Sequence, residues 1–225
     1  MFESKKIKDC FPISSKVILL LILNLNLLSC VAERNDVFPQ AVSVEIDEQL
    51  VLITAPEGFC IDQESAKRSG KNFTVFAVDC IKIKTDLRDT SGRRPISAIL
   101  TATISSQNKT KFHDIDKLEH IFLQKPGLAL LSRSNSSALL KVHEVKKEGN
   151  VLLVYAEQRE VDIDVVRSPF FWRAFFFMDE KLISLTSSNF LHQSNSKKIL
   201  RNLILEFSKN IIASNNRTEL VGKKI

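Results

Sequence analysis

Residues 170–190, FFWRAFFFMDEKLISLTSSNF, constrain the fold more than any other segment of the chain. Aromatic and aliphatic residues dominate the segment, and it is interrupted by an acidic pair only at Asp179 and Glu180. Neighbouring residues of a strand point to opposite sides of a sheet, so large apolar side chains at consecutive positions favour a strand buried on both sides. The segment therefore predicts two central strands joined by a hairpin turn at Asp179 and Glu180.

The first of these strands leaves one functional alternative open. Phe171, Arg173, Phe175 and Phe177 share one of its faces. A central strand covered on both sides explains these residues without any functional role. If this face is open instead, it forms an aromatic binding face for a lipid, a peptide or a glycan.

Alternation of apolar and polar residues predicts further strands along the chain. One strand opens near residue 41 and ends before Pro56, and others are expected over residues 73–80 and 96–104. Residues 138–160 predict two more strands around a turn at Gly149. With the aromatic hairpin, these strands indicate an antiparallel meander in the second half of the chain.

Three segments carry helical signals instead. Residues 62–70 open with Asp62 and an acidic first turn, which predicts a short helix. Residues 115–122 place apolar side chains at helical spacing and are followed by Pro126. Residues 196–212 carry their large aliphatic and aromatic side chains along one stripe, which predicts an amphipathic helix.

The order of these elements favours the α+β class. We expect an antiparallel sheet covered on one side by helices, with a long C-terminal amphipathic helix. Residues 41–213 form a single α+β domain in this interpretation, and residues 214–225 form a loose C-terminal tail.

The first 29 residues have the layout of a secretory signal. Four lysines, of which Lys16 is the last, precede an apolar run over residues 17–28. This run is shorter than the roughly 20 residues with which a helix spans a bilayer. Residues 1–29 are therefore predicted to be a signal peptide, although an uncleaved anchor stays open because bilayers adapt to short segments.

Residues 27–30, LLSC, resemble the lipobox of bacterial lipoprotein precursors. The resemblance implies acylation of Cys30, with residues 30–40 as the lipid attachment and tether. An Asp directly after the acylated cysteine resembles an inner-membrane retention signal, but this chain has Val31 at that position. This favours the outer membrane, with the domain facing the periplasm. The alternative is cleavage after Ala32 by ordinary signal peptidase, which releases a soluble periplasmic or secreted protein.

Two cysteines remain in the mature chain besides Cys30. Cys10 is lost with the leader, which leaves Cys60 and Cys80. Exported proteins meet an oxidising compartment, so this pair is expected to form a disulfide bond. Two unpaired, buried cysteines are the alternative.

Two motifs and the closing helix resemble known sequences. The APEGFC turn at residues 55–60, the WRAFFFMDEKLISLT strand pair at residues 172–186 and the last helix resemble uncharacterised exported proteins and lipoproteins of Rhodobacter-like marine alphaproteobacteria. This resemblance spans most of residues 42–212 and implies no known activity. The element order and the Pro-x-Gly-Phe opening are also similar to the PsbP-like α/β sandwich.

The densest group of residue types that bind metals is only a weak candidate for a metal site. His113, Asp116 and His120 fall at i, i+3 and i+7, on roughly one face of a helix, but a solvated face explains them equally well. The chain also lacks clustered glycines and a Gly-x-Ser-x-Gly turn. We therefore expect no metal, no cofactor and no catalytic residue.

These observations favour a cell-envelope lipoprotein with a non-enzymatic binding or assembly role. Without the leader the net charge of +6 falls to about +4, and nucleic-acid binding requires a clustered basic face, so no nucleic-acid partner is expected. The expected partners are the membrane, through the N-terminal lipid, and an unidentified envelope protein or lipid. The alternative is an envelope hydrolase that acts on peptidoglycan or lipid.

Overall fold

The structure is a computed structural model. It describes residues 39–70, 72–83, 98–105, 114–122, 124, 128, 131, 140–158, 167–179, 181–190 and 195–222. All of these residues belong to one compact unit, Phe38–Ile225. The predicted signal peptide and Cys30 lie outside the described residues.

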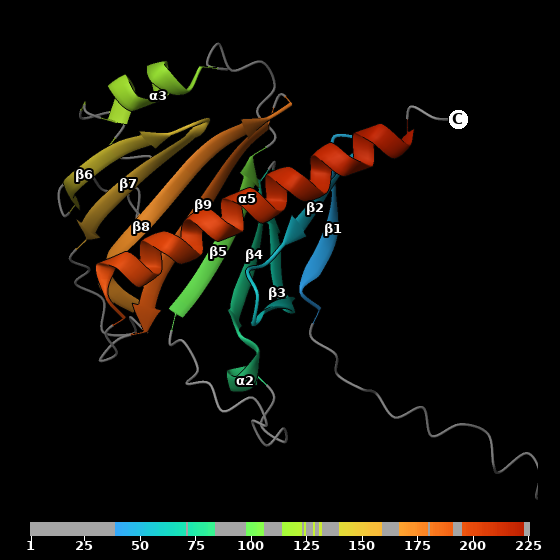
Figure 1. Cartoon of the computed structure of the whole chain (residues 1–225), viewed down its shortest axis with the longest axis horizontal. Helices are drawn as coiled ribbons and strands as arrows, with labels where there is room; N and C mark the ends of the chain where they lie inside the picture. Colours follow the sequence, from blue (N-terminus) through green and yellow to red (C-terminus); the bar gives the residue numbers. More distant parts are fainter. Residues whose placement is uncertain are drawn as a thin grey trace, which may run out of the picture. The chain divides into compact units, whose positions relative to one another are not determined.

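The unit is rich in strands and contains few helices (Figure 1). Its strands are β1 (Ala41–Ile46), β2 (Gln49–Thr54), β3 (Phe59–Ser69), β4 (Asn72–Asp79), β5 (Ala98–Ser105), β6 (Leu140–Glu148), β7 (Val151–Gln158), β8 (Arg167–Met178) and β9 (Lys181–Phe190). Its helices are α2 (Cys80–Ile83), α3 (Ile115–Phe122) and α5 (Lys197–Gly222). A mixed fold built on a large antiparallel sheet, as the sequence predicted, is confirmed.

Seven strands form the large sheet in the order β3-β4-β5-β9-β8-β7-β6, and each neighbouring pair is antiparallel. The aromatic strand β8 and its hairpin partner β9 lie inside this sheet, as their sequence predicted. Asp179, in the turn between them, has a φ of 52°. The predicted hairpin of β6 and β7 is also confirmed, with Gly149 at a φ of 58° in its turn.

The first predicted strand is instead a hairpin of two strands, β1 and β2, that form a separate small sheet. Asp47 and Glu48 lie between them with φ values of 50° and 63°. Positive φ at both central residues is the geometry of a type I′ turn, which matches the twist of an antiparallel pair. Neither residue is a glycine, so the sequence carries no glycine signal for this turn.

The short helix predicted over residues 62–70 is wrong, because this segment belongs to β3. Asp62 Oδ1 accepts hydrogen bonds from the backbone N–H groups of Glu64 and Ser65, at 3.1 and 3.2 Å. A helix cap makes the same contacts, but here they shape an irregularity in the β3–β4 ladder between Asp62 and Lys67. Pairing with β4 satisfies the backbone beyond it.

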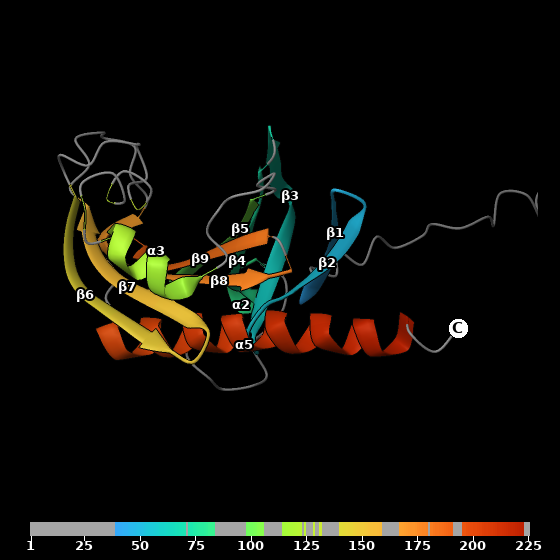
Figure 2. The ribbon, with the colours of Figure 1, turned by 90° about the horizontal axis from the view of Figure 1, so that it is seen from above.

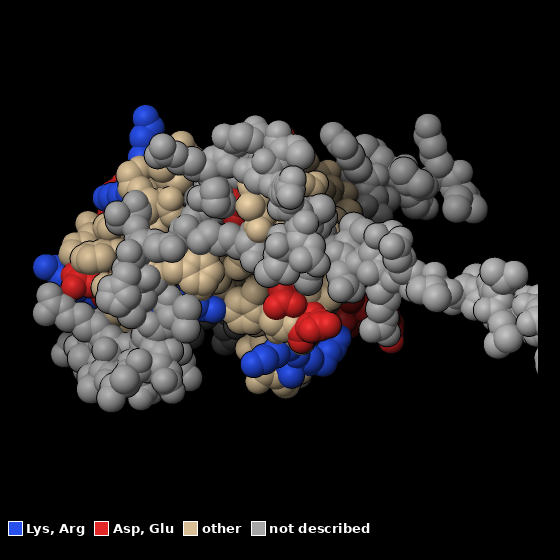
Figure 3. Space-filling model, turned by 90° about the horizontal axis from the view of Figure 1, so that it is seen from below, with Lys and Arg blue, Asp and Glu red and all other residues tan. Residues whose placement is uncertain are grey.

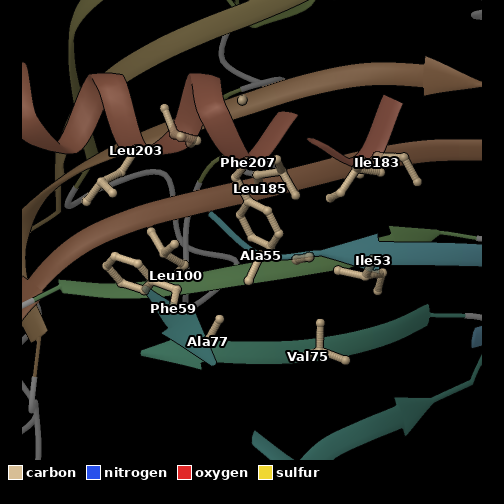
Figure 4. Close-up of a cluster of buried hydrophobic side chains, with 14 of the residues drawn as sticks. Ile53, Ala55, Phe59, Val75, Ala77, Leu100, Ile183, Leu185, Leu203 and Phe207 are labelled. Atoms are coloured by element: carbon tan, nitrogen blue, oxygen red, sulfur yellow. The ribbon is translucent and has the colours of Figure 1, made fainter. Parts of the chain in front are cut away.

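Helix α5 packs against one face of the large sheet and against the β1–β2 hairpin (Figure 2). Leu200, Leu203, Ile204, Phe207 and Ile211 are buried in this interface. Their side chains meet those of the two sheets in the larger hydrophobic core (Figure 4). In the part of the chain that the structure describes, no helix combines the length and apolar composition needed to cross a membrane.

Helix α3 packs against the opposite face of the sheet. Leu118 and Phe122 of α3 form a second core with Phe171 and Phe175, whereas the alternate residue Trp172 belongs to the core under α5. Helices therefore lie on both faces of the large sheet, and cover from one side only is not confirmed. Alternation shows which residues share a face, but it does not show which helix covers that face.

The loose tail predicted from residue 214 is also corrected, because α5 continues to Gly222. Asn215 Nδ2 donates hydrogen bonds to the backbone oxygens of Leu52 and Ile211, at 2.8 and 2.7 Å. Asn215 Oδ1 accepts from the backbone N–H of Leu52 at 2.9 Å. The polar end of α5 is thus ordered by tertiary contacts with β2 that its composition does not reveal.

Candidate functional site

The predicted disulfide between Cys60 and Cys80 is present, with Cα atoms 4.9 Å apart. It links the start of β3 to the start of α2. The backbone N–H of Cys80 also donates to the carbonyl oxygen of Gly58 at 2.9 Å, so a hydrogen bond joins the same two segments. The bond is a structural link rather than an exposed thiol pair.

The predicted aromatic binding face is covered. Phe171 and Phe175 are 0% and 3% exposed, and the ring of Phe122 on α3 lies 4.5 Å from that of Phe175. Arg173 Nη1 donates to the carbonyl oxygen of Leu131 at 2.9 Å. Phe177 packs, partly exposed, at the edge of this core. The structure thus shows the alternative in which β8 is buried on both sides.

The weak metal candidates do not form a ligand set in the described residues. Asp116 and His120 lie on α3, and His113 lies outside the described residues. Asp116 pairs with Lys147, and Gln124 Nε2 donates to His120 Nε2 at 3.0 Å. Within the described ranges, no group of three His, Cys, Asp or Glu side chains could hold a metal ion.

A groove of about 610 Å³ lies where the tip of the β1–β2 hairpin, the β8–β9 turn and the second half of α5 meet. We call it the hairpin groove. Apolar side chains from three elements line part of it, namely Val51 on β2, Phe176 and Met178 on β8 and Ile212 on α5. This is the volume of a small-ligand or short-peptide site.

The polar lining of the hairpin groove is largely neutral. Gln49, Asn150 and Asn216 contribute carboxamide groups and are exposed, and Asp179 adds a carboxylate from the β8–β9 turn. Lys181, which is 5% exposed, donates a hydrogen bond to Gln49 Oε1 and so ties the β9 end of that turn to the β1–β2 hairpin. A carboxamide both donates and accepts hydrogen bonds, so this lining suits ligands rich in amide or hydroxyl groups.

Sequence reasoning missed the hairpin groove because its parts are far apart in the chain. One signal was available. The buried residues Val44 and Ile46 are two positions apart, as on one face of a strand. The next buried residues, Val51 and Ile53, begin an odd number of positions after Ile46. A change of phase in a two-residue period requires a turn or a bulge. The exposed Leu50 beside that turn was therefore identifiable, although its surroundings were not.

Several charged side chains of the described surface form ion pairs. Lys197 Nζ lies 2.5 Å from Glu144 Oε2, and Glu148 pairs with both Lys146 and Arg201. On the face viewed in Figure 3, basic and acidic side chains of the described residues lie side by side.

A cluster of rings surrounds Lys197 at the start of α5. Lys197 Nζ lies 4.4 Å from the ring centroid of Tyr155 and 5.4 Å from that of Trp172. Trp172 Nε1 donates to the carbonyl oxygen of Lys197 at 3.0 Å. These cation–π contacts and the hydrogen bond hold the first turn of α5 against β7 and β8.

Tyr155 provides a spectroscopic test of this cluster, because it is the only tyrosine of the chain. Burial raises the pKa of its phenol above the ordinary value, Lys197 partly lowers this pKa, and Glu157 raises it. We expect tyrosinate absorbance to appear above pH 10 in the folded protein and near pH 10 in denaturant. The unfolded chain loses the proton first, so this group should make the folded state less stable as pH rises through that interval.

A Lys197→Met variant serves as the control for this titration. Without the ammonium group the phenolate loses a favourable partner, so the folded titration should move further upward. A native titration that coincides with the one in denaturant would contradict the burial of this phenol.

Comparison with known proteins found that the chain matches no family model, no curated protein and no solved structure.

Proposed function

We propose that this chain is a lipoprotein of the bacterial cell envelope whose folded unit binds another envelope protein through the hairpin groove. The groove itself carries the proposal. It combines an apolar floor with neutral hydrogen-bonding groups, and Leu50 at its rim is 69% exposed. A groove with an apolar lining and a few hydrogen-bonding groups is the usual form of a binding site. In this proposal the protein holds its partner and catalyses no reaction.

Two features support an address in the envelope. The leader over residues 1–29 and the lipobox-like residues 27–30 favour export followed by acylation of Cys30. The Cys60–Cys80 disulfide is consistent with this route, because such bonds persist in the periplasm and are rare in the cytosol. We propose that the lipid on Cys30 anchors the folded unit to the outer membrane, facing the periplasm.

Cys30→Ala tests the anchor. Each buried methylene of an acyl chain contributes about 0.8 kcal/mol to membrane binding, so loss of the acylation site should move the protein from the membrane fraction to the soluble fraction. The measurement is fractionation of cells that express either form, with metabolic labelling by a fatty acid as a second readout. Cys80→Ala serves as the control and should remain labelled. Equal membrane association without label in both forms would reject the lipid anchor.

Photocross-linking tests the binding site. A photoreactive amino acid at Leu50 should give a discrete cross-linked product with one envelope protein in intact cells. The same amino acid at Ile199, which is 40% exposed near the start of α5, is the matched control and should not. The purified partner should then bind the wild-type protein and bind less well when Met178→Asp places a charge in the groove. Identical products from both positions would reject the groove as the binding site.

A further inference from the structure

The register of the β1–β2 hairpin determines which backbone groups of β2 are used. In an antiparallel pair, residues alternate between those that bond to the partner strand and those whose N–H and C=O point away from it. A two-residue turn makes Ile46 and Gln49 a bonded pair, so Leu50, opposite Glu45, points its backbone groups outward. Leu52, two residues further on, must point the same way.

Two contacts confirm this orientation. Asn215 binds both the N–H and the C=O of Leu52 with its carboxamide, at 2.9 and 2.8 Å. On the other strand, the outward carbonyl oxygen of Glu45 accepts a hydrogen bond from Arg68 Nη2 at 2.7 Å. The Asn215 side chain thus acts in place of one residue of a neighbouring strand along the outer edge of β2.

Leu50 is the next outward-facing residue on this edge, and it lies in the hairpin groove. In the part of the chain that the structure describes, no hydrogen bond to its backbone N–H or C=O is present. An unpaired donor and acceptor at this spacing are the groups to which an added strand binds. The lysine-rich edge strand β6, with Lys141, Lys146 and Lys147, has the charged character that discourages such pairing.

We propose that the hairpin groove takes an extended polypeptide segment, which pairs with the backbone of Leu50 and so adds a short strand to the edge of β2. This inference rests on the proposed function and names the chemistry of its partner. The exposed carboxamides of Gln49, Asn150 and Asn216 hydrogen-bond further peptide groups, and the partly exposed Met178 and Ile212 receive an apolar side chain. Recognition at Leu50 is by the main chain, so the apolar floor sets the sequence preference.

A carbohydrate is the other ligand class that neutral carboxamides could bind. The outward-facing N–H and C=O of Leu50 favour the peptide, because they match the two backbone groups of a facing strand residue. Sugar sites also depend on an aromatic face on which the ring stacks. Of the two phenylalanines that line the groove, Phe176 is fully buried and Phe177 packs against the core on the other face of β8.

The experiment uses the full-length protein in detergent and a phage-displayed library of random short peptides. An enriched peptide is synthesised with a fluorescent label, and each backbone nitrogen is then methylated in turn. We expect methylation at one position to weaken binding about tenfold, which corresponds to the loss of one hydrogen bond. We also expect the amide hydrogen of Leu50 to exchange more slowly when the peptide is bound.

Leu50→Pro removes the backbone N–H at position 50 of the protein. Leu50→Ala keeps this N–H and serves as the matched control. The proline variant should bind the peptide at least about tenfold more weakly than the alanine variant. If proline prevents folding, the methylated peptides and the exchange measurement on the wild-type protein still decide the result.

The outcomes separate this inference from the proposed function. Peptides that bind in the groove without sensitivity to methylation, and without slower exchange at Leu50, would overturn strand pairing but leave partner binding intact. Binding of oligosaccharides in place of any enriched peptide would overturn the peptide as the ligand. Absence of both, together with absence of a cross-link from position 50, would overturn the proposed function as well.

Discussion

Phe207→Ala is expected to lower the free energy of unfolding by about 4 kcal/mol. Phe207 is fully buried on the inner side of α5, in the larger core. Figure 4 shows its ring beside Leu185 of β9 and Ala55, which follows β2. Removal of the ring reduces the apolar surface that folding buries. It also leaves a cavity at the point where the helix meets both sheets.

The matched control is Ile199→Ala on the same helix. Ile199 is 40% exposed, so its truncation should change the free energy of unfolding by less than about 1 kcal/mol. Denaturant titration followed by the fluorescence of the single tryptophan gives both values. For a chain of this size, the Phe207 variant should melt about 8–16 °C lower than wild type. Equal losses in the two variants would contradict the packing of α5.

Removal of the Cys60–Cys80 disulfide is expected to cost about 3 kcal/mol. The bond closes a loop with a sequence separation of 20, and in the chain-entropy model such a loop restricts the unfolded state by this amount. A Cys60→Ala, Cys80→Ala double variant should therefore melt about 6–12 °C below the oxidised wild type. Reduction of the wild-type protein should lower its melting temperature in the same direction.

The double variant is its own control for the reducing agent, because without these cysteines a reductant has no bond to break in the folded unit. Its melting temperature should be the same with and without reductant. A wild-type protein that melts at one temperature in both conditions would contradict a stabilising role for the bond.

The hairpins show what local patterns predict well. The β8–β9 hairpin follows from consecutive apolar residues and one acidic interruption, and the β6–β7 hairpin follows from a glycine turn between alternating segments. In both cases the two strands are neighbours in sequence, so the signals that define them are adjacent. The residues that predict each hairpin thus lie within the hairpin itself.

The segment after Asp62 shows where local patterns fail. Asp62 satisfies two backbone N–H groups, as a helix cap does, so its local signal is compatible with either structure. Pairing of Lys67 with Thr74 and of Arg68 with Phe73 decides the outcome. Tertiary and cross-strand contacts routinely outweigh propensity in a segment this short.

The candidate site depended on tertiary structure still more strongly. By itself the sequence determined the β6–β7 and β8–β9 hairpins and the available cysteine pair, because each follows from neighbouring residues or from composition. Only the tertiary structure decided that α3 covers Phe171 and that Asn215 binds Leu52. The contact between Asn215 and Leu52 joins residues 163 positions apart. Leu50 is then the next residue of β2 whose backbone groups point outward, into the groove. Such contacts arise from packing and hydrogen bonding between distant elements, and no periodicity along the chain encodes them.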